Sequence, residues 1–459
     1  MAELISRARA AQEVFSRYTQ QQLDDVVAAA GWAIIHPERN RALAELAVKD
    51  SGLGNVPDKI AKNHRKTLGL LRDLKGARTT GVIAEYPERG ITEIARPVGV
   101  VAAVVPSTNP GATPANNIIN ALKCGNAVIL SPSPKGYSTS AKLVSYIHAG
   151  LERVGAPRDL LQLLPAPVTK ESSGELMRQA DLVVVTGSQA NVRAAYSSGT
   201  PALGVGTGNV AVIVDDSADV NDAAAKIMAS KIFDNATSCS SENSVIIHER
   251  VYDAMLAALA REGGALLTAA EKATLQKTMF AGGHLSPAVT AQSVRKICAV
   301  AGLSRPELFE AKCLLVEETG TGREYPFSGE KLSPVLTLYR ARDFGHAFDI
   351  MRGIYDYLGD GHSCGIYSEN EAHIRRLGLE MTVCRVIVKQ AHCFATGGSF
   401  DNGLPFSLSM GCGSWGGNSF SDNLNYHHFL NITRIVRTIP EVKPSEEDLF
   451  GPFWAKYGK

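Results

Sequence analysis

Residues 98–105 read VGVVAAVV, a continuous apolar run rich in valine. Its length and its β-branched side chains predict a strand that is buried on both faces. A helix-like stretch over 113–123 and a second apolar run, Ala127-Val-Ile-Leu130, follow it directly. Short apolar runs separated by amphipathic helices are typical of parallel βαβ units. The alternation continues with a helix over 138–153, an apolar run over 160–164, a helix over 170–179 and a strand over 182–185.

A second series of the same kind starts after Asn209. It predicts a strand over 210–214, a helix over 219–231, a strand over 244–248 and a helix over 250–262. Residues 264–325 look helical and less regular, and mixed α/β patterning returns from about Val335. We therefore expect an α/β fold with two doubly wound, Rossmann-like domains. The first covers 1–209 and begins with helices, and the second covers 210–395.

Three further segments stand apart from these domains. Residues 85–97 change to short extended stretches, and residues 396–435 hold an unusual density of glycine. We expect the glycine-rich segment to return over the interface between the two domains. The tail over 436–459 begins with polar residues and prolines, so it should lie outside the core.

Composition excludes several classes of protein. The chain has 459 residues, with 47 basic and 46 acidic side chains, and 45% of its residues are hydrophobic. Balanced charge argues against a nucleic-acid binder, which needs a concentrated basic face. No apolar stretch approaches the ~20 residues of a membrane span, and the N-terminus lacks the apolar segment of a signal peptide. Eight cysteines without paired spacing indicate a reduced compartment, which we expect to be the cytoplasm.

Several catalytic motifs are absent. The chain contains no GxxxxGK[ST], no HExxH and no CxxC. Gly361-His-Ser-Cys-Gly365 matches GxSxG by letter, but a polar stretch precedes it and a strand-like one follows, so we interpret it as a chance match. His392 and Cys393 are neighbours, and adjacent side chains rarely converge on one ion. We therefore expect neither a serine hydrolase nor a metal site.

Four stretches place polar or glycine residues where predicted strands or helices meet. Cys239 lies in Thr-Ser-Cys-Ser-Ser, among groups that can donate hydrogen bonds to a thiolate, although a buried thiol is the plain alternative. Asn109 follows the strand over 98–105, where an ordinary turn before Pro110 would explain it equally well. Thr186-Gly187-Ser188 opens a helix, and a glycine before a helix N-terminus suits a pyrophosphate. Gly204-Val-Gly206-Thr-Gly208 at the joint between the domains permits close backbone approach or a tight turn.

Together these residues resemble the aldehyde dehydrogenase superfamily, and more closely its CoA-acylating branch. The resemblance extends from about residue 5 to the end of the chain. It implies that 1–209 binds the cofactor and that 210–395 is the catalytic domain. The motifs that carry it are PSTNP (106–110), FDNATSCSSENSVI (233–246), EKLSPVL (330–336), GHSCGIYS (361–368) and GCGSWGGNS (411–419).

The resemblance also implies catalytic roles. Cys239 would attack the aldehyde carbonyl as a thiolate and then carry the acyl group as a thioester. Asn109, with the backbone N–H of Cys239, would hold the developing oxyanion. Glu330 would position the nicotinamide ribose or relay protons, unless it is a surface carboxylate. His362 matches a histidine near the reaction centre, and a structural histidine is the alternative. The implied cofactor-binding residues are Pro106, Ser131, Ser133, Lys135, Thr186, Gly187, Ser188, Gly206, Gly208 and Glu330.

One departure from the hydrolytic members of the superfamily concerns the acyl acceptor. Those enzymes carry a water-activating glutamate at the start of the glycine-rich joint, where this chain has Gly204 or Val205. Water has a pKa of about 15.7 and needs a strong base, whereas a thiol with a pKa of about 8.5 needs far less help. We therefore expect CoA rather than water to take the acyl group.

The loop Ser131-Pro-Ser133-Pro134-Lys135 concerns the cofactor. Hydrolytic members place a glutamate here on the adenosine ribose, and Pro134 removes that carboxylate. Ser133 and Lys135 could bind a 2′-phosphate instead. We expect NADP to be accepted and even preferred, with NAD as the alternative.

The overall similarity is greatest to the acylating sulfoacetaldehyde dehydrogenases, which implies conversion of sulfoacetaldehyde, CoA and NADP to sulfoacetyl-CoA, or the reverse reduction. Acylating enzymes for succinate semialdehyde or acetaldehyde are the nearest alternatives. A hydrolytic semialdehyde dehydrogenase and a non-catalytic nucleotide-binding scaffold are more distant ones. The expected partners are a small anionic aldehyde and CoA, without nucleic acid or membrane. The resemblance further implies a homodimer or homotetramer, in which 85–97 forms an oligomerisation arm and 430–459 crosses to a partner.

Overall fold

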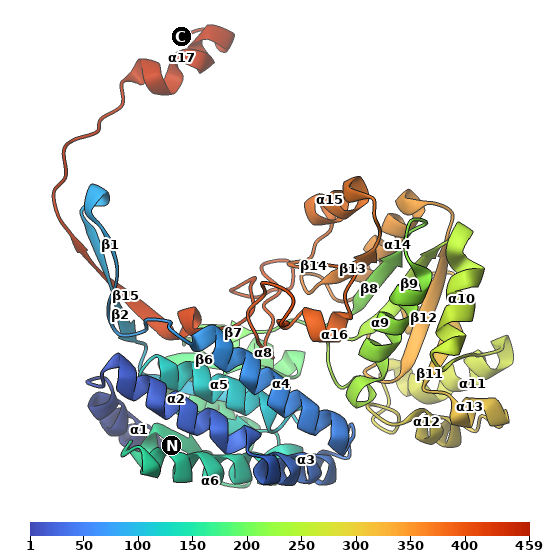
Figure 1. Cartoon of the computed structure of the whole chain (residues 1–459), viewed down its shortest axis with the longest axis horizontal. Coiled ribbons are helices and arrows are strands. Elements are labelled where there is room, and N and C mark those ends of the chain that lie inside the picture. Colours follow the sequence, from blue (N-terminus) through green and yellow to red (C-terminus); the bar gives the residue numbers. More distant parts are fainter.

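The computed structural model describes residues 1–459, and its strands form three sheets (Figure 1). Two of them are parallel sheets that belong to separate bodies of the molecule, and the third is a small antiparallel sheet at one side. The expected fold class, two doubly wound α/β domains with an added element, is confirmed.

The first domain is built on a five-stranded parallel sheet with the order β5-β4-β3-β6-β7. The central strand β3 is buried along its whole length, as the apolar run that contains it predicts. The strand order reverses between β3 and β6, and loops at the carboxyl ends of such strands form a ligand-binding crevice. The strands are β3 (Val100–Val105), β4 (Ala127–Pro132), β5 (Leu161–Leu163), β6 (Leu182–Val185) and β7 (Ala202–Gly204).

Eight helices accompany this sheet. Apolar side chains at spacings of three and four residues bury one face of each of the first two, as the sequence predicts. The helices are α1 (Ala2–Phe15), α2 (Gln20–Ile35), α3 (Pro37–Ser51), α4 (Val56–Leu74), α5 (Ala112–Lys123), α6 (Tyr137–Arg153), α7 (Lys170–Gln179) and α8 (Gln189–Tyr196).

The second domain is built on a seven-stranded parallel sheet with the order β10-β11-β12-β9-β8-β13-β14. The change of sheet falls between β7 and β8, where the sequence places the joint. The strands are β8 (Val210–Val214), β9 (Glu242–His248), β10 (Gly264–Leu266), β11 (Cys313–Glu317), β12 (Val335–Ala341), β13 (Cys364–Tyr367) and β14 (Val386–Val388). The helices are α9 (Val220–Ile232), α10 (Tyr252–Arg261), α11 (Ala269–Met279), α12 (Val294–Ala301), α13 (Pro306–Glu310), α14 (Phe344–Tyr357), α15 (Glu371–Glu380) and α16 (His392–Ala395).

One expectation about this domain is wrong. Residues 264–325 contain α11, α12 and α13, as expected, but they also contain β10 and β11 at one edge of the sheet. Both strands are short, and a run such as Cys313-Leu-Leu-Val does not distinguish a strand from a buried helical turn by its pattern. Pairing with β12 fixes β11 as a strand.

The third sheet joins segments that are far apart in the sequence. It has the order β1-β2-β15, with β1 (Gly81–Tyr86) and β2 (Ile91–Pro97) forming a hairpin and β15 (Leu430–Val436) pairing antiparallel with β2. The glycine-rich segment leads from the second domain back to the first. Its Phe406, Leu424 and Phe429 are buried in the core of the first domain.

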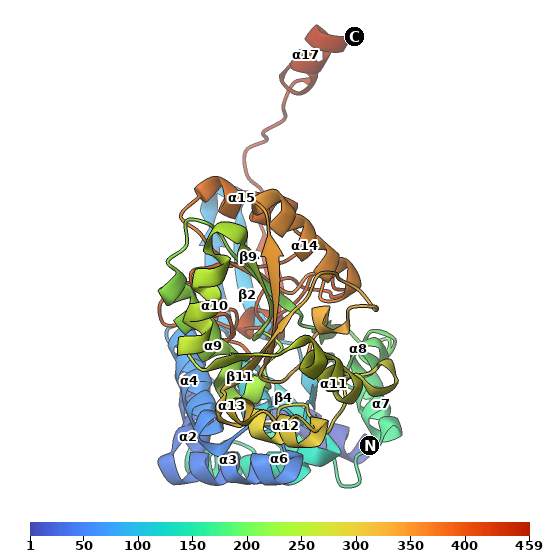
Figure 2. The ribbon, with the colours of Figure 1, turned by 90° about the vertical axis from the view of Figure 1, so that its right-hand side faces the viewer.

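The tail lies outside the core, yet it is not polar throughout. After β15 it extends away from the body and ends in α17 (Glu446–Tyr457), which no other element covers (Figures 1 and 2). This helix has no buried residue and exposes Leu449, Phe450 and Phe453. None of the helices has both the length and the apolar character required to span a membrane.

Candidate active site

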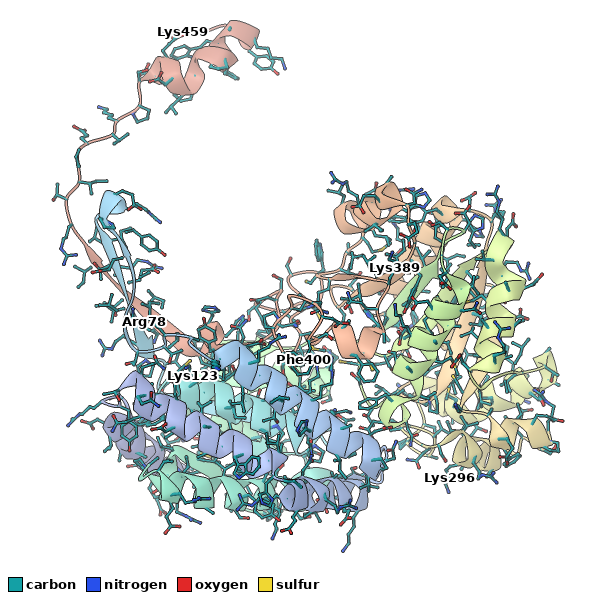
Figure 3. The ribbon with its side chains drawn as sticks, in the orientation of Figure 1. Arg78, Lys123, Lys296, Lys389, Phe400 and Lys459 are labelled. Atoms are coloured by element: carbon teal, nitrogen blue, oxygen red, sulfur yellow. The ribbon has the colours of Figure 1, made fainter.

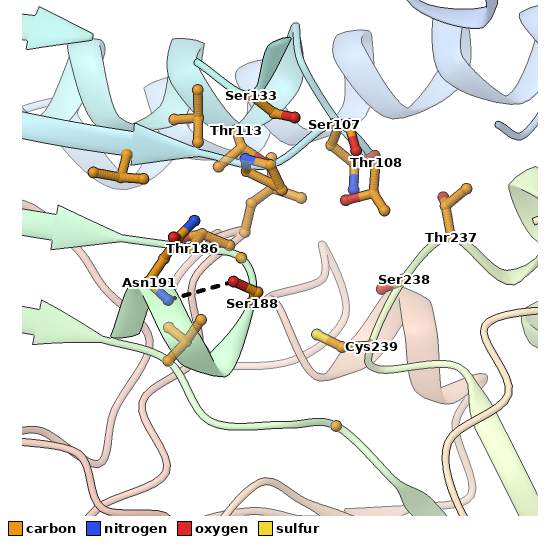
Figure 4. A pocket seen from close by; sticks show the side chains of 18 of the residues that line it. Ser107, Thr108, Thr113, Ser133, Thr186, Ser188, Asn191, Thr237, Ser238 and Cys239 are labelled. Atoms are coloured by element: carbon orange, nitrogen blue, oxygen red, sulfur yellow. Dashed lines mark hydrogen bonds between the residues drawn. The ribbon is translucent and has the colours of Figure 1, made fainter. Parts of the chain in front are cut away.

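A pocket of about 970 Å³ lies where the first sheet ends and the second domain begins (Figure 4). Thr186 and Ser188 border it from the end of β6, and Ser133 borders it from the loop after β4. Ser238 and Cys239 face them from the loop between α9 and β9. The pocket therefore occupies the crevice at the carboxyl ends of the parallel strands, where this type of fold binds ligands.

The loop that carries Cys239 has a strained backbone. Three consecutive non-glycine residues, Asp234, Asn235 and Ala236, have positive φ angles of 51°, 51° and 58°. Each such residue costs of order 1–3 kcal/mol and persists only where its surroundings hold it. The Asp234 N–H donates to Asp58 Oδ2 at 2.7 Å, and the Asn55 N–H donates to Asp234 Oδ1 at 2.9 Å. The start of α4 therefore fixes the turn that presents the cysteine.

A buried ion cluster joins this turn to α4 and to Asn109. Asp234 Oδ2 accepts from Lys59 Nζ at 3.0 Å, from Lys62 Nζ at 2.6 Å and from Thr237 Oγ1 at 2.7 Å. Lys62 Nζ also donates to Asn109 Oδ1 at 2.8 Å. Because Lys62 has only donors, this contact turns the amide oxygen of Asn109 toward α4 and leaves its Nδ2 donor for another partner.

The thiol of Cys239 is paired with a neutral histidine. The distance from Cys239 Sγ to His362 Nε2 is 3.6 Å, and His362 Nδ1 lies 2.7 Å from Ser363 Oγ. Desolvation, with the negative charge of Glu330 adding to it, raises the pKa of Cys239 to about 12. Burial and the nearby Arg385 lower the pKa of His362 to about 3. The resting pair is therefore a thiol beside an uncharged imidazole, which at this pKa is a weak base.

Glu330 is the one carboxylate among the side chains that line the pocket. Burial raises its pKa to about 8, although the positive charges of Lys231 and Lys331 act in the opposite direction. A carboxyl group with a pKa near neutrality can take up and release a proton at physiological pH. The alternative of an ordinary surface carboxylate does not fit this environment.

Two glycines in the joint allow the chain to pass directly against its neighbours, Gly208 against the loop of Cys239 and Gly206 against the glycine-rich segment. A Cβ at Gly208 would lie 2.1 Å from the carbonyl oxygen of Cys239, and one at Gly206 would lie 2.8 Å from Cys412 Sγ. Any side chain at Gly208 would therefore displace the backbone of Cys239. Val205 lines the pocket between β7 and these glycines, so no acid stands at this part of the joint.

The structure brings most of the predicted cofactor-binding residues to the other end of the pocket. Ser188 caps α8 by accepting a hydrogen bond from the Asn191 N–H at 3.3 Å (Figure 4). Lys135 is exposed and does not line the pocket, whereas Lys170, at the start of α7, does. The predicted residues that line the pocket are Pro106, Asn109, Ser131, Ser133, Thr186, Gly187, Ser188, Gly206, Gly208, Cys239 and Glu330.

Several lining residues were not expected from the sequence. Cys393 borders the pocket as a second thiol. Lys62, Arg65 and Lys66 border it from α4. The signal that could have located them is their spacing of three and four residues, which places them on one side of the helix.

The two motif matches that were set aside from the sequence lie in buried surroundings. Ser363 is fully buried, and its hydroxyl meets only His362, so it is not a serine nucleophile at a strand end. His392 Nδ1 lies 3.0 Å from Thr396 Oγ1, within its own helix. No group of three or more histidine, cysteine, aspartate or glutamate side chains is arranged to hold a metal ion.

A cysteine at the ligand-binding edge of a doubly wound sheet, with the side-chain amide of Asn109 lining the same pocket, matches the arrangement that the resemblance to aldehyde dehydrogenases implies. Comparison with known proteins identifies the family. The model of the aldehyde dehydrogenase family matches residues 1–307, and the chain belongs to this family. The resemblance expected from the sequence is thereby confirmed.

Individual relatives match the chain over nearly all its length. The acylating sulfoacetaldehyde dehydrogenase of Cupriavidus necator is 63% identical over 100% of this chain and 93% of its own. The acetylating succinate-semialdehyde dehydrogenase of Clostridium kluyveri is 40% identical over 98% of each chain. The crystal structure of an acetylating aldehyde dehydrogenase from Geobacillus thermoglucosidasius superposes with a TM-score of 0.93, at 34% identity and 97% coverage of both chains.

Proposed function

We propose that the chain is a CoA-acylating aldehyde dehydrogenase that converts sulfoacetaldehyde, CoA and NADP to sulfoacetyl-CoA, and that also catalyses the reverse reduction. The observation that carries the acylating chemistry is the pocket beside Cys239, in which no carboxylate stands at the glycine-rich joint, where the chain has Gly204 and Val205. The similarity to the Cupriavidus necator enzyme supports the choice of sulfoacetaldehyde.

Cys239 performs the first covalent step. Sγ forms a bond to the aldehyde carbon as the thiol proton passes to a base of the pocket, and the carbonyl oxygen becomes an oxyanion. Glu330, with a pKa of about 8, is a better proton acceptor for this step than His362, with a pKa of about 3. The Asn109 Nδ2 group and the backbone N–H of Cys239 donate hydrogen bonds to this oxyanion. NADP, when bound, supplies the hydride acceptor. Once the hydride has left the aldehyde carbon, Cys239 carries the acyl group as a thioester.

Transfer to CoA then regenerates the cysteine. The CoA sulfur attacks the thioester carbonyl, its proton passes to a group in the pocket, and Cys239 leaves as a thiolate that is protonated again. Glu330 is suited to move this proton, because its pKa of about 8 lies near the working pH. Without a carboxylate at Val205, water is not activated and the thioester waits for the better nucleophile.

The first domain offers a site that fits NADP. Ser131, Ser133 and the N-terminus of α8 present hydroxyl and N–H donors, and the pocket has no carboxylate at this end that would repel a 2′-phosphate. Lys170 is the cation that lines this end of the pocket. We therefore assign Lys170 to the 2′-phosphate together with Ser133, and we keep Lys135 as the residue to compare with it.

Lys170→Ala is expected to raise the KM for NADP about fivefold and to leave the KM for NAD within about twofold, since an exposed charge pair contributes at most about 1 kcal/mol. Lys135→Ala is the matched control, because it removes a lysine from the loop that carries Ser133. It is expected to change the KM for NADP and the KM for NAD little. Steady-state rates with each cofactor measure the effect. A larger NADP effect at Lys135 would return the role to that residue, and no effect at either would show that the serines suffice.

The proposed function is tested by the absorbance of the reduced nicotinamide. Purified protein is given NADP with sulfoacetaldehyde, succinate semialdehyde or acetaldehyde, each with and without CoA. We expect a rate that depends on CoA and is highest with sulfoacetaldehyde. A CoA-dependent rate that is highest with succinate semialdehyde would favour the activity of the Clostridium kluyveri relative. Equal rates without CoA would mean that water reaches the thioester, and the acylating function would be wrong.

We also infer a homo-oligomer, assembled through the three-stranded sheet and the tail, in the cytoplasm. Side chains that are apolar and exposed in the single chain support this inference, with Val436 71%, Val442 87% and Leu449 61% exposed. All eight cysteines are free, which suits a reducing compartment. Removal of residues 437–459 is expected to lower the molecular mass of the assembly in multi-angle light scattering. An unchanged mass would remove the tail from the interface.

A further inference from the structure

Helix α4 places four basic side chains on one buried side. Lys59, Lys62, Arg65 and Lys66 follow one another at spacings of three, three and one residues. Lys59, Lys62 and Lys66 are only 3%, 6% and 8% exposed. Lysine is almost never buried without a partner, so each of these cations requires an explanation.

The four cations fall into two groups. Lys59 and Lys62 are both neutralised by Asp234, as described above. Arg65 and Lys66 form no ion pair with any carboxylate. Lys66 Nζ donates to two backbone carbonyls, Gly397 O at 2.7 Å and Ser407 O at 3.1 Å. Backbone dipoles therefore hold the charge of Lys66 without a counter-ion, whereas Arg65 has the carboxylate of Asp401 nearby, although the two form no direct ion pair.

Contacts around Arg65 fix its guanidinium group. It donates to Phe394 O at 2.9 Å and to Ser399 Oγ at 3.1 Å. Its Cζ atom also lies 5.4 Å and 5.3 Å from the ring centroids of Phe394 and Phe406. The ring of Phe400, at the junction of the two domains, is the third aromatic ring that this guanidinium group lies over (Figure 3). The cation is therefore preorganised, and ordering it costs little when a ligand binds.

Both cations belong to the pocket that contains Cys239. Arg65 and Lys66 line it together with the aromatic and apolar side chains Phe233, Phe394 and Met410. Burial and the charge of Arg65 lower the pKa of Lys66 to about 7, and a thiolate at Cys239 would raise it. A bound anion would stabilise the charged lysine in the same way, because it would supply the missing counter-ion.

We propose that Arg65 and Lys66 bind the anionic group of the aldehyde substrate and so select a sulfonate or carboxylate aldehyde over a neutral one. This inference rests on the proposed function and adds the residues that set its specificity. Three sulfonate oxygens can accept hydrogen bonds from the guanidinium and the ammonium group together. The rest of the molecule lies among apolar side chains, with its carbonyl at Cys239.

The test compares two aldehydes that differ in one group. Sulfoacetaldehyde and acetaldehyde have the same two carbons, and only the first carries a sulfonate. Lys66→Met and Arg65→Met are each expected to lower kcat/KM for sulfoacetaldehyde at least ~30-fold, the usual effect of leaving a buried charge unpaired. The value for acetaldehyde should change less than ~3-fold, because the charge is not used there. The KM values for NADP and CoA should stay the same.

Arg72→Met is the matched control. Arg72 lies on the same helix and over the ring of Phe406, at 4.9 Å, but it does not line the pocket. It is expected to leave the preference between the two aldehydes unchanged. Equal losses for both aldehydes in the Lys66 and Arg65 variants, or losses confined to NADP or CoA, would overturn the proposal. If only the KM for NADP or for CoA rises, Arg65 and Lys66 bind a phosphate group of that molecule instead of the aldehyde.

A measurement on the unaltered protein covers the case in which these variants do not fold. Ethanesulfonate carries the anion without the aldehyde, and ethanesulfonamide is its neutral counterpart. We expect ethanesulfonate to compete with sulfoacetaldehyde and ethanesulfonamide not to compete. Equal inhibition by both would overturn the anion site. If the unaltered protein has no CoA-dependent activity with any anionic aldehyde, the proposed function itself fails, and the two failures are thereby distinguished.

Discussion

Cys239→Ala is expected to abolish aldehyde oxidation, with kcat reduced at least ~10⁴-fold, because the other cysteine that lines the pocket, Cys393, is buried and Cys239 is the partly exposed thiol. The substitution removes one sulfur atom from a loop that is held by its neighbours, so the free energy of unfolding should change little. Initial rates with NADP and CoA measure the loss, and mass spectrometry of the protein after addition of acyl-CoA measures the acyl adduct. The adduct should be absent from the variant.

Cys384→Ala is the control for this experiment. Cys239 and Cys384 are the two cysteines that are not fully buried, so both are open to an alkylating reagent. Cys384 does not line the pocket, and its removal should leave activity unchanged. Inactivation by alkylation should therefore follow labelling of Cys239 alone. Full activity after complete labelling of Cys239 would remove this cysteine from the mechanism, and labelling confined to other cysteines would favour a non-catalytic scaffold.

The pH dependence of this alkylation follows from the environment of the thiol. Burial and Glu330 raise the pKa of Cys239 to about 12, so the thiolate fraction of the free protein is small at neutral pH. Since the thiolate is the reactive form, the labelling rate should rise about tenfold per pH unit between about pH 7 and about pH 9. A plateau near neutrality would show that the thiolate is stabilised in the free protein.

Local pattern predicted most of the first domain because its elements follow one another in sequence. The strands β3, β4 and β6 are wholly apolar and bounded by turns, and their helices have regular spacing. The strands β10 and β11 were missed because each is short and becomes a strand through its neighbour in the sheet. The left-handed turn at Asp234 could not be predicted for the same reason. Its conformation depends on Asp58 and Asn55, which lie far away in the sequence.

The residues of the candidate site also fall into those that the sequence predicts and those that only tertiary packing brings to the pocket. Residues at strand ends, such as Asn109 and Ser188, are located by the fold class, since parallel strands bring their carboxyl ends to one edge. The basic residues of α4 reach the pocket only through the packing of α4 against the turn at Asp234. Their spacing predicts a shared side of the helix, but not whether that side faces solvent or a pocket. Likewise, sequence proximity pointed to Lys135, whereas the course of the chain brings Lys170 to the pocket.

Lys62→Met is expected to lower kcat about 100-fold, with a smaller change in the KM for the aldehyde. The 2.8 Å contact from Lys62 Nζ to Asn109 Oδ1 keeps the amide turned so that Nδ2 serves the oxyanion. Without it the amide can rotate, and loss of one oxyanion donor costs about 10²–10³-fold in kcat. A donor to the oxyanion acts on the transition state more than on the bound aldehyde, so the loss should appear in kcat. Steady-state rates at saturating NADP and CoA measure it.

Lys59→Met separates this positioning effect from a simple loss of stability. Both lysines neutralise Asp234, but Lys59 donates its other hydrogen bond to Thr108 O and does not contact Asn109. The two variants should therefore show similar losses in the free energy of unfolding, while only Lys62→Met loses most of kcat. In an Asn109→Ala background Lys62→Met should add little, because the amide that it positions is gone. Additive losses in the double variant would mean that Lys62 acts independently of Asn109, through the charge that it brings to the pocket.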